Sequence, residues 1–188
     1  MPIDIPVIET ERLILRGFEE RDMDAFAAMN ADPRFVKFLA DGKPLNRTES
    51  WRLMAMLIGH WQLRGFGFWA MESKQSGEFI GRTGLLYPEG WPGIELGWGL
   101  HPDAWGLGYA TESASAVRDW AFNVAGLGHL ISIIHPDNEQ SKRVAQRIGE
   151  RYSHKDMVNG REVVIFSVNE TDVNATEVCQ LHEAVPVA

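Results

Sequence analysis

The chain has 188 residues, 45% of them hydrophobic, which fits one globular domain with a sizeable core. A net charge of −8 at pH 7 and a pI of about 5.2 argue against a nucleic-acid partner, which needs a broad basic face. An apolar run of about 18 residues and a basic-then-apolar N-terminal signal are both missing, so we expect no membrane partner. Cys179 is the single cysteine, which rules out an intrachain disulfide and fits the reducing cytoplasm, where we expect the protein to reside.

The first third of the chain predicts one strand and two helices. The strand spans residues 12–16, and a short helix follows over residues 22–29. Residues 31–47 carry no periodic pattern and are expected to be irregular. Asn46, with a glutamate three positions later, resembles a capping box at the start of a longer helix that ends near residue 65. The apolar face expected for that helix consists of Trp51, Met54, Ala55, Ile58 and Trp61.

The middle of the chain predicts a hairpin, a further strand and a helix. Residues 66–72 and 78–86 form the hairpin, and residues 94–100 form the next strand. Two glycines lie in the turn that follows, and apolar residues then recur at spacings of four, three, four and three. This spacing predicts one buried helix face, and the helix is expected to end near Ala125. The residues of that face are Ala110, Ala114, Val117, Ala121 and Val124.

The last part of the chain predicts a strand at residues 130–134, a helix at residues 138–148 and a hairpin. Asn159-Gly160 is a strong signal for a two-residue hairpin turn. Residues 1–168 are therefore expected to form a single α+β domain, layered on a sheet of mixed strand direction rather than doubly wound. The tail, residues 169–188, shows no period and is expected to be either disordered or packed on the domain.

The turn at residues 105–111 lies where a strand is followed by a helix. Its glycines allow the backbone to bring several N–H groups to one point. The helix start adds unpaired N–H groups and a partial positive charge, so the turn is suited to bind phosphate. A purely steric role for the glycines is the alternative. A nucleotide-binding P-loop is disfavoured because the Lys-Ser/Thr pair that follows such a loop is missing.

Two segments together resemble the GNAT superfamily of acetyl-CoA-dependent N-acetyltransferases. They are Trp105-Gly106-Leu107-Gly108-Tyr109-Ala110-Thr111-Glu112 and, about thirty residues later, Asn138-Glu139-Gln140-Ser141-Lys142-Arg143-Val144-Ala145-Gln146-Arg147-Ile148-Gly149. With Thr10-Glu11-Arg12-Leu13-Ile14-Leu15-Arg16 at the start, the chain is most similar to the ribosomal-protein N-terminal acetyltransferases, over roughly residues 8–168. The resemblance implies a GNAT-like layered α+β fold. About seven strands would be flanked by four helices, with a splay between the fourth and fifth strands.

The resemblance also implies acetyl-CoA as cosubstrate. The turn residues would hold its pyrophosphate through backbone N–H groups: Trp105, Gly106, Leu107, Gly108, Tyr109, Ala110 and Thr111. The strand edge near Trp98 and Leu100 would pair with pantetheine, and the Leu100 N–H would polarise the thioester carbonyl. Asn138 would bind the pantetheine arm and Arg143 could reach a phosphate; the alternatives are an N-cap and a solvated helix residue. Asp103 stands where the family has Gln or Arg, which removes one donor.

The implied reaction is direct attack of a neutral primary amine on acetyl-CoA. An alkyl amine with a pKa of about 10 is mostly protonated at neutral pH, so a base is useful. Glu95 is the first candidate because desolvation inside an apolar strand would raise its pKa; a solvent-facing or arginine-paired side chain is the alternative. Water or His101 could also act. The tyrosine that many members use as an acid is replaced by Ala145, so Ser141 is the candidate proton donor to the thiolate, unless its hydroxyl only caps the helix.

The acceptor is expected to enter over residues 31–47 and the hairpin around Asn159-Gly160. A protein N-terminus, a small amine and an amino-acid derivative all stay open, and so does a homodimer. The histidines show no metal-ligand spacing with carboxylates, so no metal is expected. The rival from another class is a GNAT-like module that binds acyl-CoA without turnover, which the missing tyrosine and Asp103 keep open.

Overall fold

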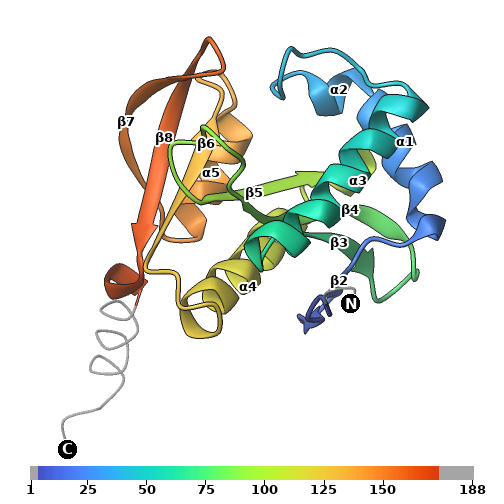
Figure 1. Ribbon diagram of the computed structural model, residues 1–188, viewed down its shortest axis with the longest axis horizontal. Helices are drawn as coiled ribbons and strands as arrows, with labels where there is room; N and C mark the ends of the chain where they lie inside the picture. Colours follow the sequence, from blue (N-terminus) through green and yellow to red (C-terminus); the bar gives the residue numbers. More distant parts are fainter. Residues whose placement is uncertain (1–3, 174–188) are drawn as a thin grey trace, which may run out of the picture.

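A single mixed sheet organises the protein in the computed structural model, which describes residues 4–173 (Figure 1). Its strands are β1 (Ile8–Glu9), β2 (Leu13–Arg16), β3 (Phe68–Ser73), β4 (Phe79–Leu86), β5 (Glu95–Leu100), β6 (His129–Ile134), β7 (Arg151–Val158) and β8 (Arg161–Asn169). The helices are α1 (Met23–Ala31), α2 (Pro33–Val36), α3 (Arg47–Arg64), α4 (Tyr109–Asn123) and α5 (Glu139–Arg147), with 3₁₀ turns η1 (Glu20–Asp22) and η2 (Pro102–Ala104).

The sheet has eight strands in the order β1-β2-β3-β4-β5-β6-β8-β7. All neighbours are antiparallel except β5 and β6, which are parallel. The predicted mixed α+β sheet is confirmed. The prediction missed one strand because β1 is only two residues long and forms solely by pairing with β2, Ile8 opposite Leu15.

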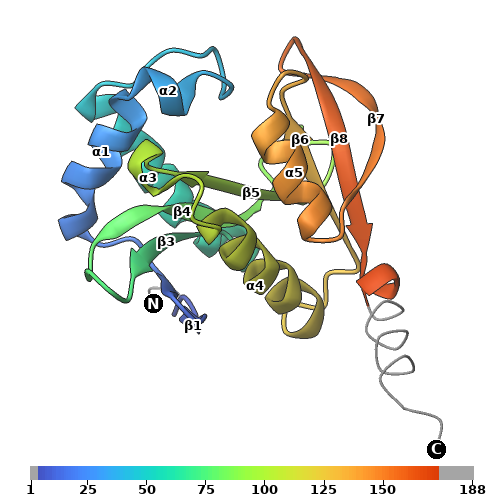
Figure 2. The ribbon, with the colours of Figure 1, turned by 180° about the vertical axis from the view of Figure 1, so that it is seen from behind.

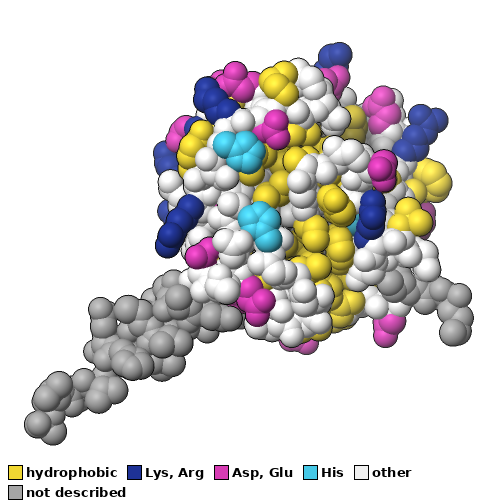
Figure 3. All heavy atoms as spheres, turned by 60° about the vertical axis from the view of Figure 1, so that its left-hand side comes forward, with side chains coloured by type: hydrophobic (Ala, Val, Ile, Leu, Met, Phe, Trp, Pro, Cys, Tyr) yellow, Lys and Arg dark blue, Asp and Glu magenta, His cyan; other side chains and the backbone are white. Residues whose placement is uncertain are grey.

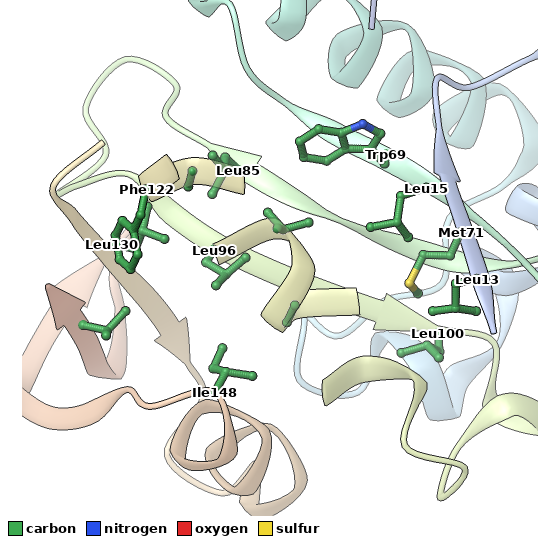
Figure 4. Packing of buried hydrophobic residues seen from close by; sticks show 14 of the residues in the cluster. Leu13, Leu15, Trp69, Met71, Leu85, Leu96, Leu100, Phe122, Leu130 and Ile148 are labelled. Carbon is green, nitrogen blue, oxygen red and sulfur yellow. The ribbon is translucent and has the colours of Figure 1, made fainter. Parts of the chain in front are cut away.

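Apolar residues on the two faces of the sheet form separate core clusters. Neighbouring residues of β3 point to opposite faces, so Phe68 belongs to one cluster and Trp69 to the other. The α4 face holds a ring cluster of Trp61, Trp69 and Trp120, with centroids 4.6–5.9 Å apart in edge-to-face geometry. Figure 4 shows leucines from β2, β4, β5 and β6 packed together in the core cluster on this face, with Ile148 at its far end.

The parallel pair β5 and β6 touches at one position only. Glu95 lies opposite Ile131, and the Ile131 N–H donates to the Ile94 carbonyl at 3.0 Å. Every antiparallel strand pair from β2 onward shares four or more register positions. The two strands therefore diverge toward their carboxyl ends, which is the splay that the family resemblance predicted. Both ribbon views place α1 and α2 on one side of this opening and α5 with β7 and β8 on the other (Figures 1 and 2).

The apolar face predicted for α3 is confirmed at Met54 and Trp61 and wrong at Trp51, Ala55 and Ile58. Trp51 is 57% exposed and Ile58 is 41% exposed, whereas the buried stripe consists of Ser50, Met54, Leu57, His60 and Trp61. Hydrophobicity misled the prediction because two polar residues are buried there. His60 is satisfied on both ring nitrogens, by the Phe66 carbonyl at 2.8 Å and the Tyr87 N–H at 2.9 Å.

Two smaller expectations also need correction. Val124 is 70% exposed because α4 ends at Asn123, and Phe122 takes its place in the core. Residues 31–47 are not wholly irregular, because Asp32 caps the short helix α2 by accepting from the Arg34 N–H at 2.8 Å. The hairpin turn is confirmed, with φ of +49° at Asn159 and +75° at Gly160. Of the predicted tail, residues 174–188 lie outside the described part.

Candidate active site

The glycine turn lies between η2 and the first residue of α4. Gly106 and Gly108 both adopt left-handed φ, +77° and +84°, which favours glycine at each. A Cβ on Gly106 would meet nothing within 4 Å, so the backbone conformation alone requires this glycine. Gly108 caps α4, and the turn is open to solvent, with Leu107 54% exposed. The turn thus offers the unpaired N–H groups at the start of a fifteen-residue helix to an anion.

A clamp from the start of the chain holds this turn in place. The Glu112 carboxylate accepts from the Thr10 hydroxyl at 2.6 Å and from the Arg12 N–H at 2.8 Å, and it pairs with the Arg12 guanidinium at 2.6 Å. Arg12 also donates to the Leu107 carbonyl at 2.8 Å and lies over the Tyr109 ring at 4.6 Å. Sequence reasoning assigned Arg12 no role. Its only signal was the family-like segment Thr10–Arg16.

The edge of β5 that faces the splay is open beyond Glu95. The His101 N–H donates to Ile80 on β4 at 2.9 Å, whereas the Leu96 carbonyl points toward β6. Because backbone groups alternate in direction along a strand, the N–H groups of Trp98 and Leu100 also point toward β6. Pairing with β6 stops at Glu95 in the described residues. The Leu100 carbonyl accepts from the Trp105 indole at 2.9 Å, which ties the open edge to the glycine turn.

Side chains replace the ladder hydrogen bonds where the strands separate. A regular parallel ladder would continue from Ile133 to Leu96. Instead, the Ser132 hydroxyl lies 2.7 Å from the Leu96 carbonyl oxygen, and the Ile133 N–H donates to the Glu95 carboxylate. Glu95 also accepts from the Trp91 indole at 2.7 Å. The splay therefore depends on side chains of β5 and β6 that take the place of backbone partners.

The Glu95 carboxyl group has the ionisation expected of a general base. Removal from water raises the pKa of Glu95 to about 7, against the opposing effect of hydrogen bonds from Trp91 and the Ile133 N–H. The charge of Arg82 also lowers this pKa, although the two side chains form no ion pair. A carboxyl group with a pKa near neutrality can accept a proton at working pH and release it again.

Glu150 is a second buried carboxyl group at the splay. It is 2% exposed, and its Oε1 lies 3.0 Å from the Ser132 hydroxyl, which has one proton and two oxygen neighbours. A protonated Glu150 supplies the proton for the second hydrogen bond. Burial, followed by the charge of Glu95, raises the pKa of Glu150 to about 8, while Ser132 and Arg118 oppose the shift. No sequence pattern singled out Glu150 or Ser132.

The remaining predicted residues lie around the opening. The Asn138 side chain accepts from the Ser141 N–H at 3.1 Å, so Asn138 is the N-cap of α5. The Ser141 hydroxyl forms no hydrogen bond with another described residue and stays available. Arg143 is exposed on α5. His101 turns toward Asp103, with 3.5 Å between Nδ1 and the carboxylate, rather than toward Glu95.

One face of the molecule gathers apolar side chains. Figure 3 shows them as a band through the middle of that face, with charged side chains mostly toward its edge. Across the opening, the Phe38 ring after α2 meets the His135 ring after β6, with centroids 5.1 Å apart. Within residues 4–173, no cluster of His, Cys, Asp or Glu is arranged to hold a metal ion. The same residues include no helix long and apolar enough to cross a membrane.

The splayed sheet, the glycine turn and the open strand edge define the class of protein. The model of the acetyltransferase (GNAT) domain matches residues 12–151, so the chain belongs to the GNAT family and is an acetyl-CoA-dependent N-acetyltransferase. It is 33% identical to protein YkkB of Bacillus subtilis (strain 168) over 152 residues, 77% of this chain and 84% of YkkB.

Solved structures show the same architecture. An acetyltransferase from Agrobacterium tumefaciens str. C58 superposes with a TM-score of 0.80 at 32% identity, covering 90% of this chain and 98% of that one. Mycobacterium smegmatis RimJ, solved in complex with CoA-disulfide, shares the fold with a TM-score of 0.71 at 18% identity, covering 86% and 83%. The match to the family model confirms the predicted family and, with it, acetyl-CoA as cosubstrate.

Proposed function

We propose that this enzyme transfers the acetyl group to a primary amine by direct attack within a ternary complex. The observation that carries the proposal is the position of Glu95. Its carboxyl group, with a pKa of about 7, lies at the point where β5 and β6 separate, beside the open edge of β5. A base is thereby placed next to the strand that would hold the thioester.

The proposed acetyl-CoA site runs along the open edge of β5 and ends at the glycine turn. The pyrophosphate would bind the N–H groups of residues 105–111, at the start of α4. Pantetheine would pair with the open edge at Trp98 and Leu100 as an added strand does. Asn138 and the exposed Arg143 on α5 are proposed to contact the pantetheine arm and a phosphate, respectively. Asp103 lacks the side-chain donor that the family has at this position. The proposed phosphate contacts do not depend on that donor, because they come from backbone N–H groups.

The proposed chemistry is transfer of the acetyl group from the thioester to the amine. Glu95 removes the proton from the ammonium form, directly or through water, and the neutral amine attacks the thioester carbonyl. The Leu100 N–H stabilises the oxyanion. The new C–N bond forms, and the C–S bond breaks as the nitrogen gives up its second proton. That proton replaces the one that the free Ser141 hydroxyl, the proposed donor, passes to the thiolate. We propose that residues 1–168 contain all of these groups.

The proposal is tested by release of free CoA thiol from acetyl-CoA against a panel of amines and N-terminal peptides, with calorimetric acetyl-CoA binding on the same sample. Acceptor-dependent release supports the proposed transfer. Loss of release in Glu95→Gln or Ser141→Ala, with acetyl-CoA binding retained, supports the assigned roles. Binding without release from any acceptor or acyl donor would instead favour a non-catalytic acyl-CoA-binding module.

A further inference from the structure

Arg82 is a cation that the proposed mechanism does not use. It lies in the middle of β4, opposite Ala70 on β3 and Gly99 on β5. Its guanidinium lies over the rings of Phe26 and Phe35, at 5.4 Å and 5.7 Å. The Nη1 atom is buried with no hydrogen-bond partner within residues 4–173, although the residue as a whole is partly exposed.

A cation in such a place normally has an anionic partner. Charged groups removed from water are stabilised by pairing and hydrogen bonding, and leaving one unpaired is costly. Burial lowers the pKa of Arg82 to about 10, and only the charge of Glu95 opposes this shift. Arg82 has no carboxylate within ion-pair distance in the part of the chain that the structure describes. Its Nη1 therefore has neither a carboxylate nor another hydrogen-bond acceptor among these residues.

Arg82 and Glu95 lie on the same face of the sheet. Arg82 is opposite Gly99, and Glu95 is four residues earlier on β5, so the two share a face because side chains alternate along a strand. The two rows are about 14 Å apart along the strand, at ~3.4 Å per residue. The charge of each side chain nevertheless affects the pKa of the other. Gly84 and Gly97 form the pair between them, and the Phe68 ring covers Gly97, 2.9 Å from where its Cβ would lie. The floor of the interval is therefore an aromatic ring rather than a side chain of β4 or β5.

We propose that the acceptor is a small amine that also carries a carboxylate, as an amino acid does, and that Arg82 binds this carboxylate while Glu95 receives the amine. The inference rests on the proposed function and narrows its acceptor. A guanidinium matches a carboxylate through two parallel hydrogen bonds, which also orient the molecule. Most protein N-termini lack a carboxylate next to the amine, so this arrangement favours amino-acid-like acceptors over them.

The test compares L-amino acids with the corresponding L-amino-acid amides, which keep the amine and side chain but lose the negative charge. Peptides with a neutral first residue serve as the third probe. Rates are compared per unprotonated amine, because the amide group lowers the pKa of the neighbouring amine. Thiol release gives kcat and KM for wild type, Arg82→Gln, Arg82→Lys and the exposed control Arg52→Gln, and calorimetry gives the acetyl-CoA affinity.

We expect at least one amino acid to exceed its amide at least about tenfold in kcat/KM. At pH 9, where Glu95 is ionised with or without the charge of Arg82, Arg82→Gln should raise KM for that acid on the order of 10- to 100-fold, the effect of removing one partner of a charge pair. KM for the amide and the acetyl-CoA affinity should change far less. Arg82→Lys should restore part of the preference and Arg52→Gln should match wild type. The wild-type comparison of acid with amide needs no variant, so poor folding of Arg82→Gln would not remove the test.

Three results would overturn the inference. The first is equal kcat/KM for acid and amide in wild type. The second is acetylation of neutral amines or peptides alone. The third is equal impairment of acid and amide by Arg82→Gln, which marks a structural role. Each leaves acetyl transfer itself intact. Absence of thiol release from every acceptor would overturn the proposed function as well, so the two failures are distinguishable.

Discussion

Glu95 and Glu150 are the two carboxyl groups that border the splay, and their environments separate their roles. Glu95 accepts from Trp91 and from the Ile133 N–H, which keeps an ionised form accessible near neutral pH. Glu150 is buried beside the Ser132 hydroxyl, with an Oε2 that has no hydrogen-bond partner in the described chain. We propose that the first exchanges a proton with the acceptor. The second is suited to remain protonated and hold Ser132 against Leu96.

For Glu95→Gln we expect turnover to fall about 10²- to 10⁴-fold, the usual contribution of a general base, with unchanged acetyl-CoA affinity. In wild type, kcat should rise with pH through about 7 as Glu95 loses its proton. The variant should lose this inflection and keep only the rise due to the amine. Initial rates of thiol release from pH 5.5 to 9 measure both. An inflection near 7 that survives in the variant would assign the titration to another group.

Glu150 makes stability depend on pH in a definite direction. The pKa of Glu150 is about 8 in the folded protein, against the ordinary glutamate value of 4.5 that applies to the unfolded chain. Its contribution to stability is therefore full below about pH 4.5 and is lost as pH rises through about 8. Glu150→Gln cannot ionise but can still donate to Ser132. Its Tm relative to wild type should therefore increase from pH 5 to pH 9. For the exposed control Glu11→Gln, the difference in Tm from wild type should be the same at every pH. If the plots of Tm against pH for Glu150→Gln and wild type run parallel, Glu150 does not have this role.

At the scale of elements, the glycine turn works because three separate segments fix it. The β1–β2 connection supplies Thr10 and Arg12, α4 supplies Glu112, and Trp105 joins the turn to the end of β5. Gly106 and Gly108 adopt the left-handed φ that the turn requires. The proposed anion site is thus held in shape before a ligand arrives, which limits the ordering cost of binding.

Gly106→Ala and Gly65→Ala form a matched pair that isolates this role. Both glycines have nearly the same φ, +77° and +76°, and a Cβ on either would meet nothing within 4 Å. Each substitution should cost about 1 kcal/mol of stability through backbone strain alone. Only Gly106→Ala should weaken acetyl-CoA binding, on the order of tenfold, because strain there moves the N–H groups. Calorimetry and thermal unfolding check the two effects, and equal acetyl-CoA affinities would remove the turn from the binding site.

For the whole molecule, the decisive feature is a sheet in two parts. Strands β1 to β5 and strands β6 to β8 share one backbone register pair. Apolar contacts around Leu96, Leu130 and Ile148 hold the parts together on the α4 face. A ligand that pairs with β5 inside the splay should bridge the two parts. It should also stabilise the folded state by about 2.7 kcal/mol at a hundredfold excess over Kd.

Hydrogen exchange tests that bridge at single residues. Acetyl-CoA should slow exchange of the Trp98 and Leu100 amide protons, which face the splay. The His101 amide, already bonded to Ile80, should change little and serves as the internal control. Amide exchange followed by NMR with and without acetyl-CoA provides the measurement. Protection of α5 amides without protection of Trp98 or Leu100 would place pantetheine elsewhere.

The sequence by itself determined most of the element order, the hairpin turn at Asn159-Gly160, the family and the position of the glycine turn. These depend on local patterns, because periodicity, turn residues and capping act over a few neighbouring positions. The same locality explains the failure in α3. Its buried face includes Ser50 and His60, and the partners that satisfy His60 come from the loop before β3 and the end of β4.

Only the tertiary structure decided which charged groups lose contact with water and which side chains meet. Arg12 reaches Glu112 across a hundred residues, and Ser132 on β6 joins Leu96 on β5 to Glu150 in the loop before β7. The isolation of Arg82 also depends on α1 and α2 covering β4. Desolvation and hydrogen bonding are set by such distant neighbours. The sequence singled out Glu95 by its place in an apolar strand, but the partners of Glu95 and the whole role of Glu150 became visible only when the strands were placed in the sheet.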